Sequence, residues 1–478
     1  MTMTCDVLII GSGFGGCLLA AMLQRQGRQV VVIDRNRHPR FAIGESSTPL
    51  ADQTLHEIAS EAGLPELLPL CRYGSWKRAY PDLTCGLKRG FSYFDHTYGE
   101  VGTRQLLVTA SHSNERSDTH WLRSDVDEFV ARTAVQHGAT LIEGAEFELR
   151  TNSNHWQVSG TADGRSFSVR SPFVVDASGP AGVVMNHLGI ASQTNRLKTQ
   201  SSAVYGHFRN VRSNRELLLN ADRPIDHHPF DCDAAAVHHV LPDGWMWQLR
   251  FDDQTVSAGL MTRGQSSATA QVWGDTLKRH PFLQHQFATS ELIRVPSLRI
   301  TGRIQRLRQQ AAGANWAALP STAGFIDPLH STGIAHTLFG VRRIAERLGS
   351  ENWSTAAAAE YSQTTIDELL LIDELVEGCY AALPSFRLWS AWSMLYFAAV
   401  TSMEQNGSRR SDFLRAADMD FRHALKDSRR QLQATIEAGS READIEQLER
   451  WLKRQIEPWN HVGLFESPDG MYAGTAAP

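Results

Sequence analysis

One segment of this chain has the residue types and spacing that bind a nucleotide cofactor. A short apolar run meets spaced glycines in Asp6-Val-Leu-Ile-Ile-Gly-Ser-Gly-Phe-Gly-Gly16. Glycines at this spacing allow a tight turn, a close approach of the backbone to a pyrophosphate, and close contact between a helix and a sheet. The helix that follows would offer free N–H groups and a positive dipole end to the phosphates. The segment predicts a dinucleotide site, and the alternative is a glycine-rich turn without a ligand.

The elements around this turn follow the order that a dinucleotide-binding unit needs. Residues 5–10 predict a buried strand, residues 17–26 a helix, and residues 29–33 a second strand that ends in Asp34. An acid at this position accepts a hydrogen bond from a free ribose 2′-hydroxyl, which favours FAD or NAD over NADP. The predicted cofactor contacts here are Gly11, Ser12, Gly13, Phe14, Gly15, Gly16, Asp34 and Arg35.

Composition narrows the class of protein. The chain has 478 residues, of which 42% are hydrophobic and 21% charged, as in ordinary globular enzymes. A net charge of −5 argues against nucleic acid as a partner. No apolar run has the length of a membrane span, and the start of the chain does not have the pattern of a signal peptide. The six cysteines do not form Cys-x-x-Cys pairs, so we expect no metal site, no disulfide framework and a cytoplasmic location.

The rest of the chain predicts an α/β protein with added parts. Aromatic strands are expected in the first quarter, alternating strands before residue 300, and long amphipathic helices toward the end. The expected fold is a Rossmann-like module with an inserted β-sheet on the substrate side and a C-terminal helical cap. The predicted divisions are a core at 1–350, with 73–110 and 190–300 forming the substrate-side sheet, and a cap at 351–478.

Four motifs in a fixed order resemble the FAD module shared by aromatic hydroxylases and flavin-dependent halogenases. They are Gly11-x-Gly-x-x-Gly16, Arg123, Asp176-Ala-Ser-Gly179 and Gly324-Phe-Ile-Asp-Pro328. The resemblance implies that Asp327 holds the ribityl chain of FAD and that Arg123, at the start of a helix capped by Ser124 or Asp125, contacts the cofactor. It also places Ala177, Ser178 and Gly179 near the adenine and pyrophosphate. The alternatives are a surface role for Arg123 and a turn-capping role for Asp176.

The loop Pro328-Leu-His-Ser-Thr-Gly-Ile334 is similar to the halogenase loop beside the flavin. A halide needs N–H donors at a helix N-terminus, and the backbone of Thr332 and Gly333 could supply them. Gly333 and Ile334 would also contact the cofactor. The alternative is an ordinary helix start capped by Ser331 or Thr332.

A second motif separates halogenases from hydroxylases. Gly244-Trp-Met-Trp-Gln-Leu-Arg250 resembles the Trp-x-Trp-x-Ile-Pro motif of flavin-dependent halogenases, with Leu249 and Arg250 as departures. In that family the motif is associated with suppressed monooxygenation beside the flavin. The alternative is that Trp245 and Trp247, which share one face of a strand, simply pack in a core.

The segment Thr84-Cys-Gly-Leu-Lys-Arg-Gly-Phe-Ser-Tyr-Phe94 resembles the one that carries the essential lysine of the family, which indicates Lys88. The family uses FADH2, O2 and chloride or bromide to form hypohalous acid, and the lysine directs this oxidant as a hydrogen-bond donor or as a haloamine. The haloamine requires a neutral amine, which burial favours. Lys77 is the competing candidate, and a solvated lysine is the alternative.

The substrate is predicted to be an electron-rich aromatic. His330 stands where tryptophan halogenases carry a glutamate, which favours the phenol or pyrrole branch, and the resemblance is closest to the free-phenol enzymes. The segment 383–392 resembles their helical cap, so Trp389 and Trp392 are candidate walls of the substrate pocket, and Phe91, on the aromatic strand after Lys88, is a third. For Trp389 and Trp392 the alternative is helix packing. Whether the aromatic arrives free or on a carrier protein stays open.

The function predicted from these motifs is a two-component, FAD-dependent halogenase. No second glycine fingerprint opens another nucleotide unit, so a separate flavin reductase is expected to supply the reduced FAD. The first alternative is an FAD-dependent aromatic hydroxylase. The second is a flavoprotein that senses or stores flavin without turnover.

Overall fold

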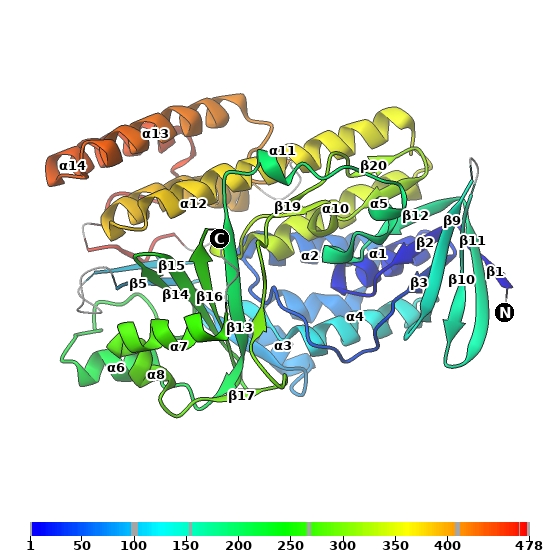
Figure 1. The fold of residues 1–478 in the computed structure, drawn as a ribbon, viewed down its shortest axis with the longest axis horizontal. Helices are drawn as coiled ribbons and strands as arrows, with labels where there is room; N and C mark the ends of the chain where they lie inside the picture. Colours follow the sequence, from blue (N-terminus) through cyan, green and yellow to red (C-terminus); the bar gives the residue numbers. More distant parts are fainter. Residues whose placement is uncertain are drawn as a thin grey trace.

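The structure is a computed structural model. It describes residues 2–96, 104–152, 155–264, 269–406, 412–467 and 469–475, so short parts of the predicted sheet segments lie outside the described residues. Figure 1 shows the dinucleotide-binding sheet near the N-terminus and a larger sheet at the other end of the molecule, with long helices running across both.

The dinucleotide-binding unit is built on a six-stranded sheet in the order β20-β21-β12-β2-β3-β8. β2, β3 and β12 are continuous apolar runs, and every residue in these strands is buried. Parallel strands of this kind are covered by helices on both faces, which is why their sequences do not alternate. The strands are β2 (Val7–Ile10), β3 (Val30–Ile33), β8 (Thr140–Ile142), β12 (Phe173–Asp176), β20 (Ala312–Gly313) and β21 (Trp316–Ala318).

A nine-stranded, largely antiparallel sheet forms the second half of the core. Its strands come from the segments predicted to form the inserted sheet, with one short strand added near the C-terminus. They are β5 (Gly90–Asp95), β6 (Gln105–Thr109), β13 (Ser201–Arg209), β14 (Ala236–Leu241), β15 (Gly244–Arg250), β16 (Val256–Arg263), β17 (Glu291–Ile293), β18 (Arg299–Ile300) and β23 (Met471–Tyr472).

Smaller strands complete the β-structure. A four-stranded sheet, ordered β1-β11-β10-β9, lies at the end of the molecule that carries the N-terminus (Figure 1), and two short pairs lie elsewhere. The strands are β1 (Thr2–Thr4), β9 (Glu146–Thr151), β10 (Trp156–Ala162) and β11 (Arg165–Ser171), with the pairs β4 (Cys85–Lys88) with β7 (Asp118–Trp121) and β19 (Arg306–Leu307) with β22 (Gly324–Phe325).

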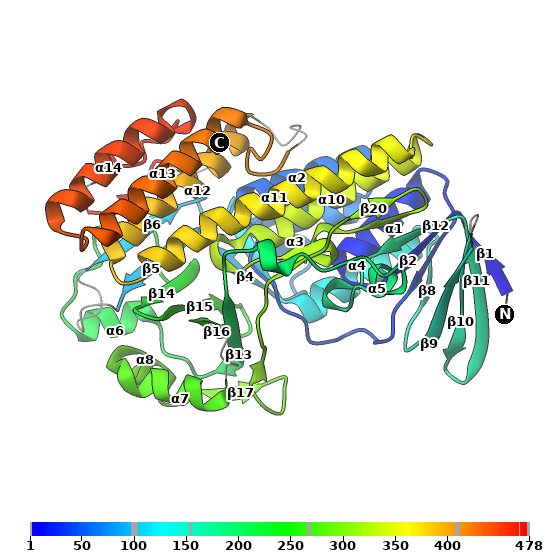
Figure 2. The ribbon, with the colours of Figure 1, turned by 45° about the horizontal axis from the view of Figure 1, so that its top comes forward.

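Long helices cover the sheets, and Figure 2 shows the last four of them stacked along one side. α11 and α12 are largely buried, and a Cβ at Gly378 would lie only 2.0 Å from the Trp392 ring, so the glycine allows their close contact. None of the described helices is both long and apolar enough to span a membrane. The last helices are α10 (Thr332–Gly349), α11 (Thr355–Ala382), α12 (Phe386–Asn406), α13 (Met419–Glu437) and α14 (Glu442–Ile456).

The remaining helices are shorter and connect or cover the strands. They are α1 (Phe14–Arg25), α2 (Pro49–Ala62), α3 (Tyr73–Ala79), α4 (Arg123–Gln136), α5 (Val183–His187), α6 (Asn214–Asn220), α7 (Ala270–Arg279), α8 (Pro281–Phe287) and α9 (Pro320–Ala323). The predicted fold class, a Rossmann-like module with an inserted sheet and a helical C-terminal region, is confirmed. The division at residues 350 and 351 stays a prediction. β23 lies within the predicted cap but pairs with β6 of the core sheet.

Candidate active site

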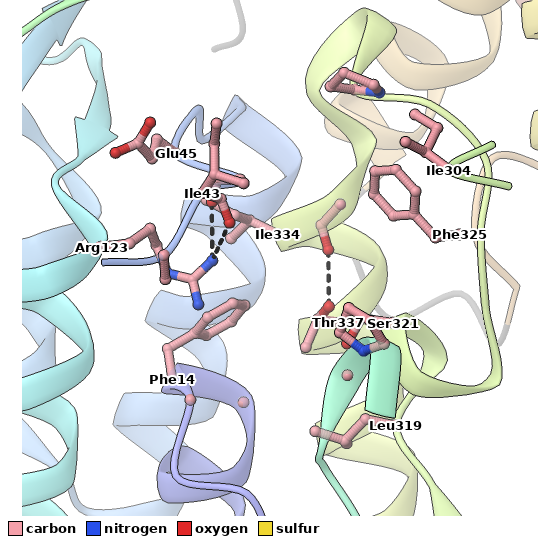
Figure 3. A pocket seen from close by; sticks show the side chains of 18 of the residues that line it. Phe14, Ile43, Glu45, Arg123, Ile304, Leu319, Ser321, Phe325, Ile334 and Thr337 are labelled. Carbon is pink, nitrogen blue, oxygen red and sulfur yellow. Dashed lines mark hydrogen bonds between the residues drawn. The ribbon is translucent and has the colours of Figure 1, made fainter. Parts of the chain in front are cut away.

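A cavity of about 780 Å³ lies between the two halves of the core. Figure 3 shows its walls, with Phe14 and Arg123 on one side and Ile334 and Thr337 on the other. The structure brings two glycine-rich segments, residues 11–16 and 324–334, together here. Every predicted cofactor contact except Ser12 lines the cavity, namely Gly11, Gly13, Phe14, Gly15, Gly16, Asp34, Arg35, Arg123, Ala177, Ser178, Gly179, Asp327, Gly333 and Ile334.

The glycine turn is shaped by contacts that only glycine permits. Gly11 has a φ of 111°, and a Cβ there would lie 2.3 Å from the Ala177 carbonyl oxygen. A Cβ at Gly16 would lie 2.2 Å from the carbonyl oxygen of Gly11. α1 begins after Gly13 without a side-chain cap, so the N–H groups of its first turn are available to an anion.

The Asp34 side chain is hydrogen-bonded to the glycine turn. Its Oδ2 accepts hydrogen bonds from the Ser12 amide at 2.8 Å and the Ser12 hydroxyl at 2.9 Å, and its Oδ1 accepts from the Asn36 amide at 2.8 Å. A carboxylate offers about four acceptor positions, so the carboxylate can still accept a ribose hydroxyl. Ser12 is fully buried and holds the Asp34 carboxylate in place at the cavity wall.

Arg123 holds a loop over the cavity. Its Nη1 donates to the carbonyl oxygens of Ile43 at 3.0 Å and Gly44 at 3.1 Å, as Figure 3 shows, while Nε donates to Asp127 at 2.7 Å. Its guanidinium carbon lies 4.8 Å from the centre of the Phe14 ring. The helix α4 begins at Arg123 with Leu122 before it, and no side chain caps it, so the prediction of Ser124 or Asp125 as the cap was wrong.

Asp327 lies where the inserted sheet meets the helical region. Its Oδ2 accepts hydrogen bonds from the Ser201 hydroxyl at 3.0 Å and the Tyr380 hydroxyl at 2.9 Å, and its Oδ1 accepts from the Leu329 amide at 3.2 Å. Burial raises the pKa of this carboxyl to about 7. Asp176, by contrast, accepts from the Val184 and Met185 amides at the start of α5, which is the capping role.

The loop before α10 presents free amides to the cavity. His330 and Ser331 both have positive φ, 63° and 57°, which turns the chain sharply into the helix. Ser331 makes no side-chain hydrogen bond to the first turn of α10, so the predicted alternative of a Ser331 cap is not observed. Thr332 and Gly333 line the cavity, and no atom lies within 4 Å of a Cβ built on Gly333. The first turn therefore offers N–H donors and a helix dipole to an anion.

The His330 side chain is buried in the core, with 1% of its surface exposed to solvent. It lies within hydrogen-bonding distance of the Tyr93 hydroxyl, 3.3 Å from Nδ1, and stacks on Tyr396 at 4.3 Å. Burial lowers its pKa to about 3, so the ring is neutral at ordinary pH. This histidine therefore brings no charge to the loop before α10.

Of the two motif tryptophans, Trp247 lines the cavity, and the indole N–H of Trp245 donates to the Tyr380 hydroxyl at 3.1 Å. Trp247 lies across Gly259 on the neighbouring strand, where a Cβ would be 2.0 Å from the indole. Arg250, the departure from the halogenase motif, donates from Nε to Asp233 at 3.0 Å and does not line the cavity.

Lys88 is completely buried at the end of β4, where it pairs in register with Asp118 on β7. Its Nζ donates to the Ser47 carbonyl oxygen, lies 3.7 Å from Asp118 Oδ2, and lies 4.2 Å from the centre of the Phe91 ring. Burial lowers the pKa of the ammonium, while the nearby carboxylates oppose the shift. Lys77, the competing candidate, is partly exposed and pairs with Asp252 at 2.9 Å.

Three buried carboxyl groups surround Lys88, and the sequence patterns identified none of them. They are Asp52 on α2, Asp118 on β7 and Glu404 on α12, each less than 8% exposed. Burial raises the pKa of all three, and that of Glu404 rises to about 8. A buried lysine requires an opposite charge, but only the tertiary fold shows which acids supply it.

A second cavity, of about 350 Å³, lies beside these carboxyl groups and is lined by all three. Lys88 itself lines neither of these two cavities, but its contacts lie beside both. Its ammonium contacts Ser47, whose neighbour Ser46 lines the large cavity, and it faces Asp118, which lines the small one.

Trp389 and Trp392 are core residues with 1% exposure, and neither lines these two cavities. Trp389 packs on Tyr93 at 4.8 Å between ring centres, and the Trp392 indole N–H donates to the Leu375 carbonyl oxygen at 2.7 Å. Phe91 is the predicted pocket residue that the structure places against Lys88. The roles of all three in substrate binding stay predictions.

The residues around the large cavity fit a dinucleotide such as FAD. The backbone clearances at Gly11 and Gly16 admit a close phosphate, the uncapped starts of α1 and α10 face the same space, and Asp34 and Asp327 provide acceptors within it. A group that reaches both glycine-rich segments must therefore span the cavity.

Comparison with known proteins identifies the family. The tryptophan halogenase family matches residues 113–392, more than half of the chain, and a Rossmann-like NAD(P)-binding family matches residues 9–59. The chain therefore belongs to the tryptophan halogenase family. It is a flavin-dependent halogenase that uses FAD and a halide, acts on a small aromatic substrate and requires a separate flavin reductase.

Individual relatives agree with this assignment. Monodechloroaminopyrrolnitrin halogenase PrnC of Pseudomonas fluorescens is 27% identical, over 82% of this chain and 70% of that protein. Tetracycline 7-halogenase of Kitasatospora aureofaciens is 27% identical, over 78% of this chain and 67% of that protein. The fold matches halogenase PltM in complex with phloroglucinol and FAD, with a TM-score of 0.85, 22% identity and 99% coverage of both chains.

Proposed function

We propose that this enzyme halogenates a free electron-rich aromatic, a phenol in the first instance, and that Lys88 directs the oxidant onto the ring. FAD, held by Gly11–Gly16, Asp34, Arg123 and Asp327, would supply the chemistry that oxidises chloride or bromide to hypohalous acid. The aromatic would reach Lys88 from the second cavity.

The position of Lys88 carries this proposal. Its side chain is fully buried, and its ammonium contacts a residue beside the large cavity and another that lines the small one. A small neutral oxidant that passes from one cavity to the other would meet an N–H donor at this point. The Phe91 ring, 4.2 Å from Nζ, would restrict its approach.

The free amides at the start of α10 support the halide site. Thr332 and Gly333 line the large cavity, and the backbone N–H groups of this first turn, together with the dipole of an 18-residue helix, would favour an anion there. A halide bound in this turn would lie in the same space as the cofactor.

In the proposed transfer, the halogen of HOX forms a bond to a ring carbon as the O–X bond breaks. The ring carbon loses its proton, and the hydroxide of HOX leaves as water after taking up a proton. The Lys88 ammonium polarises HOX by donating a hydrogen bond to its oxygen. Asp118, with Oδ2 at 3.7 Å from Nζ, would stabilise the protonated form of the lysine during the transfer.

The test is product analysis by mass spectrometry on a panel of free phenols, with enzyme, FAD, a flavin reductase, NADH, and bromide or chloride. Wild type is compared with Lys88→Ala and Lys88→Met, and Lys77→Ala is the matched control. We expect the Lys88 variants to lose halogenated product by about 100-fold or more, as when a positioned proton donor is removed. Flavin binding should stay intact, and Lys77→Ala should match wild type.

Two outcomes would contradict the proposal. Undiminished halogenation by the Lys88 variants would assign the directing role to another residue. Hydroxylated products without halogen would show that the enzyme hydroxylates its substrate, as the aromatic hydroxylases do. Product from free phenols without a carrier protein is the expected result.

A cytoplasmic location belongs to the same proposal and is supported by six buried cysteines, all of them free thiols.

A further inference from the structure

The second cavity has an acidic floor and a polar, exposed mouth. Asp52, Asp118 and Glu404 are buried in its lining, together with Ser111. The charged and titratable groups at the mouth are exposed or partly exposed, so solvent screens them. They are His56, Glu57, Arg72, His112 and Arg116.

Two carboxylate oxygens in this floor make no hydrogen bond with any described residue. The Asp52 Oδ1 accepts from the Ser47 hydroxyl, and the Asp118 Oδ1 accepts from the Ser111 hydroxyl at 3.0 Å. The Oδ2 of each acid is buried without a hydrogen bond, although that of Asp118 lies 3.7 Å from the Lys88 ammonium. Asp52 is 6% exposed, and Lys88 and Arg72 act on its carboxyl by charge, without a hydrogen bond to Oδ2.

An unpaired buried acceptor is unfavourable unless a ligand donates to it. Among the described residues, three buried carboxyl groups lie in this floor beside the Lys88 ammonium, while Arg72 acts on Asp52 from the exposed mouth. A ligand that brings hydrogen-bond donors would stabilise this arrangement, whereas one that brings a further negative charge would destabilise it.

We propose that the second cavity binds the aromatic substrate through hydroxyl or amino substituents that donate to Asp52, and that it rejects arenes carrying a carboxylate. This inference rests on the proposed function, because it places the ring beside Lys88. It assigns Asp52 as a specificity-determining residue and the Glu404 carboxyl on α12 as a second hydrogen-bonding partner.

The geometry also orients the ring. A donor substituent bound to Asp52 on α2 would fix one edge of the ring, and transfer directed by Lys88 would require the ring carbons next to that substituent to face the lysine. Hydroxyl and amino groups activate these same positions toward electrophilic halogenation. Recognition and reactivity would therefore depend on one substituent.

The test measures binding to the FAD-loaded enzyme by titration calorimetry, without reductase, so that no turnover occurs. The ligands are resorcinol, 3-aminophenol, 1,3-dimethoxybenzene and 3,5-dihydroxybenzoate. We expect resorcinol and 3-aminophenol to bind about 10- to 100-fold more tightly than 1,3-dimethoxybenzene, because only the donor-bearing rings satisfy the buried Asp52 Oδ2. The benzoate should bind at least about 10-fold more weakly than resorcinol.

Variants then identify the acceptor. In Asp52→Asn, which preserves the side-chain volume, the ratio of the two affinities for resorcinol and 1,3-dimethoxybenzene should fall toward one. Comparing ratios removes the effect of the methyl groups on fit. Glu404→Gln should reduce the ratio less, and Glu61→Gln, an exposed carboxylate on the same helix as Asp52, should leave it unchanged. Circular dichroism confirms that each variant is folded.

The results separate the two proposals. Equal affinity of wild type for donor-bearing and methylated rings, or tight binding of the benzoate, would overturn this inference even if halogenation depends on Lys88. An unchanged ratio in Asp52→Asn would remove Asp52 from the recognition site. Conversely, Lys88→Ala should keep the donor preference while losing product, and full product from that variant would contradict only the proposed function. If Asp52→Asn does not fold, the wild-type ligand series and Glu404→Gln still decide.

Discussion

Lys88 illustrates how a buried charge can be made tolerable by its immediate surroundings. Its ammonium donates to one carbonyl oxygen, lies over an aromatic ring and faces three carboxyl groups. Burial disfavours the charge on the lysine and on the acids alike, while their mutual attraction opposes this effect. The group is therefore sensitive to the removal of any one member.

Glu404 gives this cluster a measurable pH dependence. Burial raises its pKa from 4.5 to about 8, so the folded protein holds a proton that the unfolded chain releases between these values. The contribution of this proton to the free energy of unfolding is fully present below the unfolded pKa of 4.5. It is lost as the pH rises through the folded pKa of about 8. We expect Glu404→Gln, which cannot ionise, to gain melting temperature relative to wild type as the pH rises from 5 to about 9.

Thermal unfolding of both proteins in matched buffers across this range is the measurement. Glu61→Gln provides the control for removing a carboxylate at an exposed site, and its curve should run parallel to that of wild type. Parallel curves for Glu404→Gln as well would show that the Glu404 carboxyl is ionised throughout and that its pKa is not raised.

At the scale of elements, the β15–β16 pair shows how a strand positions an aromatic side chain beside the cofactor space. Trp247 faces Gly259 directly across the pair, and the indole lies where a Cβ would be. The ring is therefore pressed against the backbone of β16 and leaves the large cavity open. A glycine opposite a tryptophan is a sequence feature that single-strand patterns do not reveal.

Gly259→Ala should force the Trp247 ring toward the cavity, because a Cβ would lie 2.0 Å from the indole. We expect a stability loss of about 1–3 kcal/mol, as in overpacked cores, together with weaker FAD binding. Chemical denaturation and fluorescence titration with FAD measure the two effects. Gly274→Ala, in the middle of α7 with open space around it, is the matched control and should stabilise by roughly 0.5–1 kcal/mol. Unchanged FAD affinity in Gly259→Ala would mean that the indole does not border the bound cofactor.

At the scale of the whole molecule, the large cavity joins segments from both halves of the core. The wall from the dinucleotide-binding sheet includes Gly11, and the opposite walls come from the inserted sheet and the start of α10. A ligand in this space connects these parts, so its binding energy should appear as stability of the entire fold.

We expect FAD at a hundredfold excess over its dissociation constant to stabilise wild type by about 2.7 kcal/mol. Gly11→Ala should lose most of this gain, because φ is 111° and the Cβ would lie 2.3 Å from the Ala177 carbonyl oxygen. Melting curves with and without FAD measure the difference. An equal FAD-dependent shift in Gly11→Ala would show that this turn does not approach the pyrophosphate.

The parts of the site that depend on local sequence could be predicted, whereas those that depend on distant contacts could not. The glycine turn and the helix start at Thr332 follow from short-range steric and dipole effects. The positive φ of His330 and Ser331 could not be predicted, because neither residue is a glycine and the surrounding core imposes the turn.

Contacts between segments far apart in the chain could not be predicted from the sequence either. The register that sets Asp118 beside Lys88, and the approach of Glu404 from α12, arise from strand pairing and helix packing between segments far apart in sequence. The expectation for Trp389 rested on the resemblance of its segment to a helical cap, and its role in substrate binding stays a prediction. The structure packs its side chain among other rings in the core. Aromatic type alone does not distinguish a pocket wall from a packed interior.

The joining of distant segments at the large cavity also sets an order of events during synthesis of the chain. Gly16 leaves the ribosome long before Thr332, with a delay of roughly 15 to 60 seconds at bacterial and eukaryotic elongation rates. The walls cannot enclose FAD until α10 has emerged and docked, so cofactor loading belongs to the nearly finished polypeptide. Cells that make the protein faster than they supply flavin would accumulate folded but empty enzyme, and riboflavin supply during expression would then determine the active fraction.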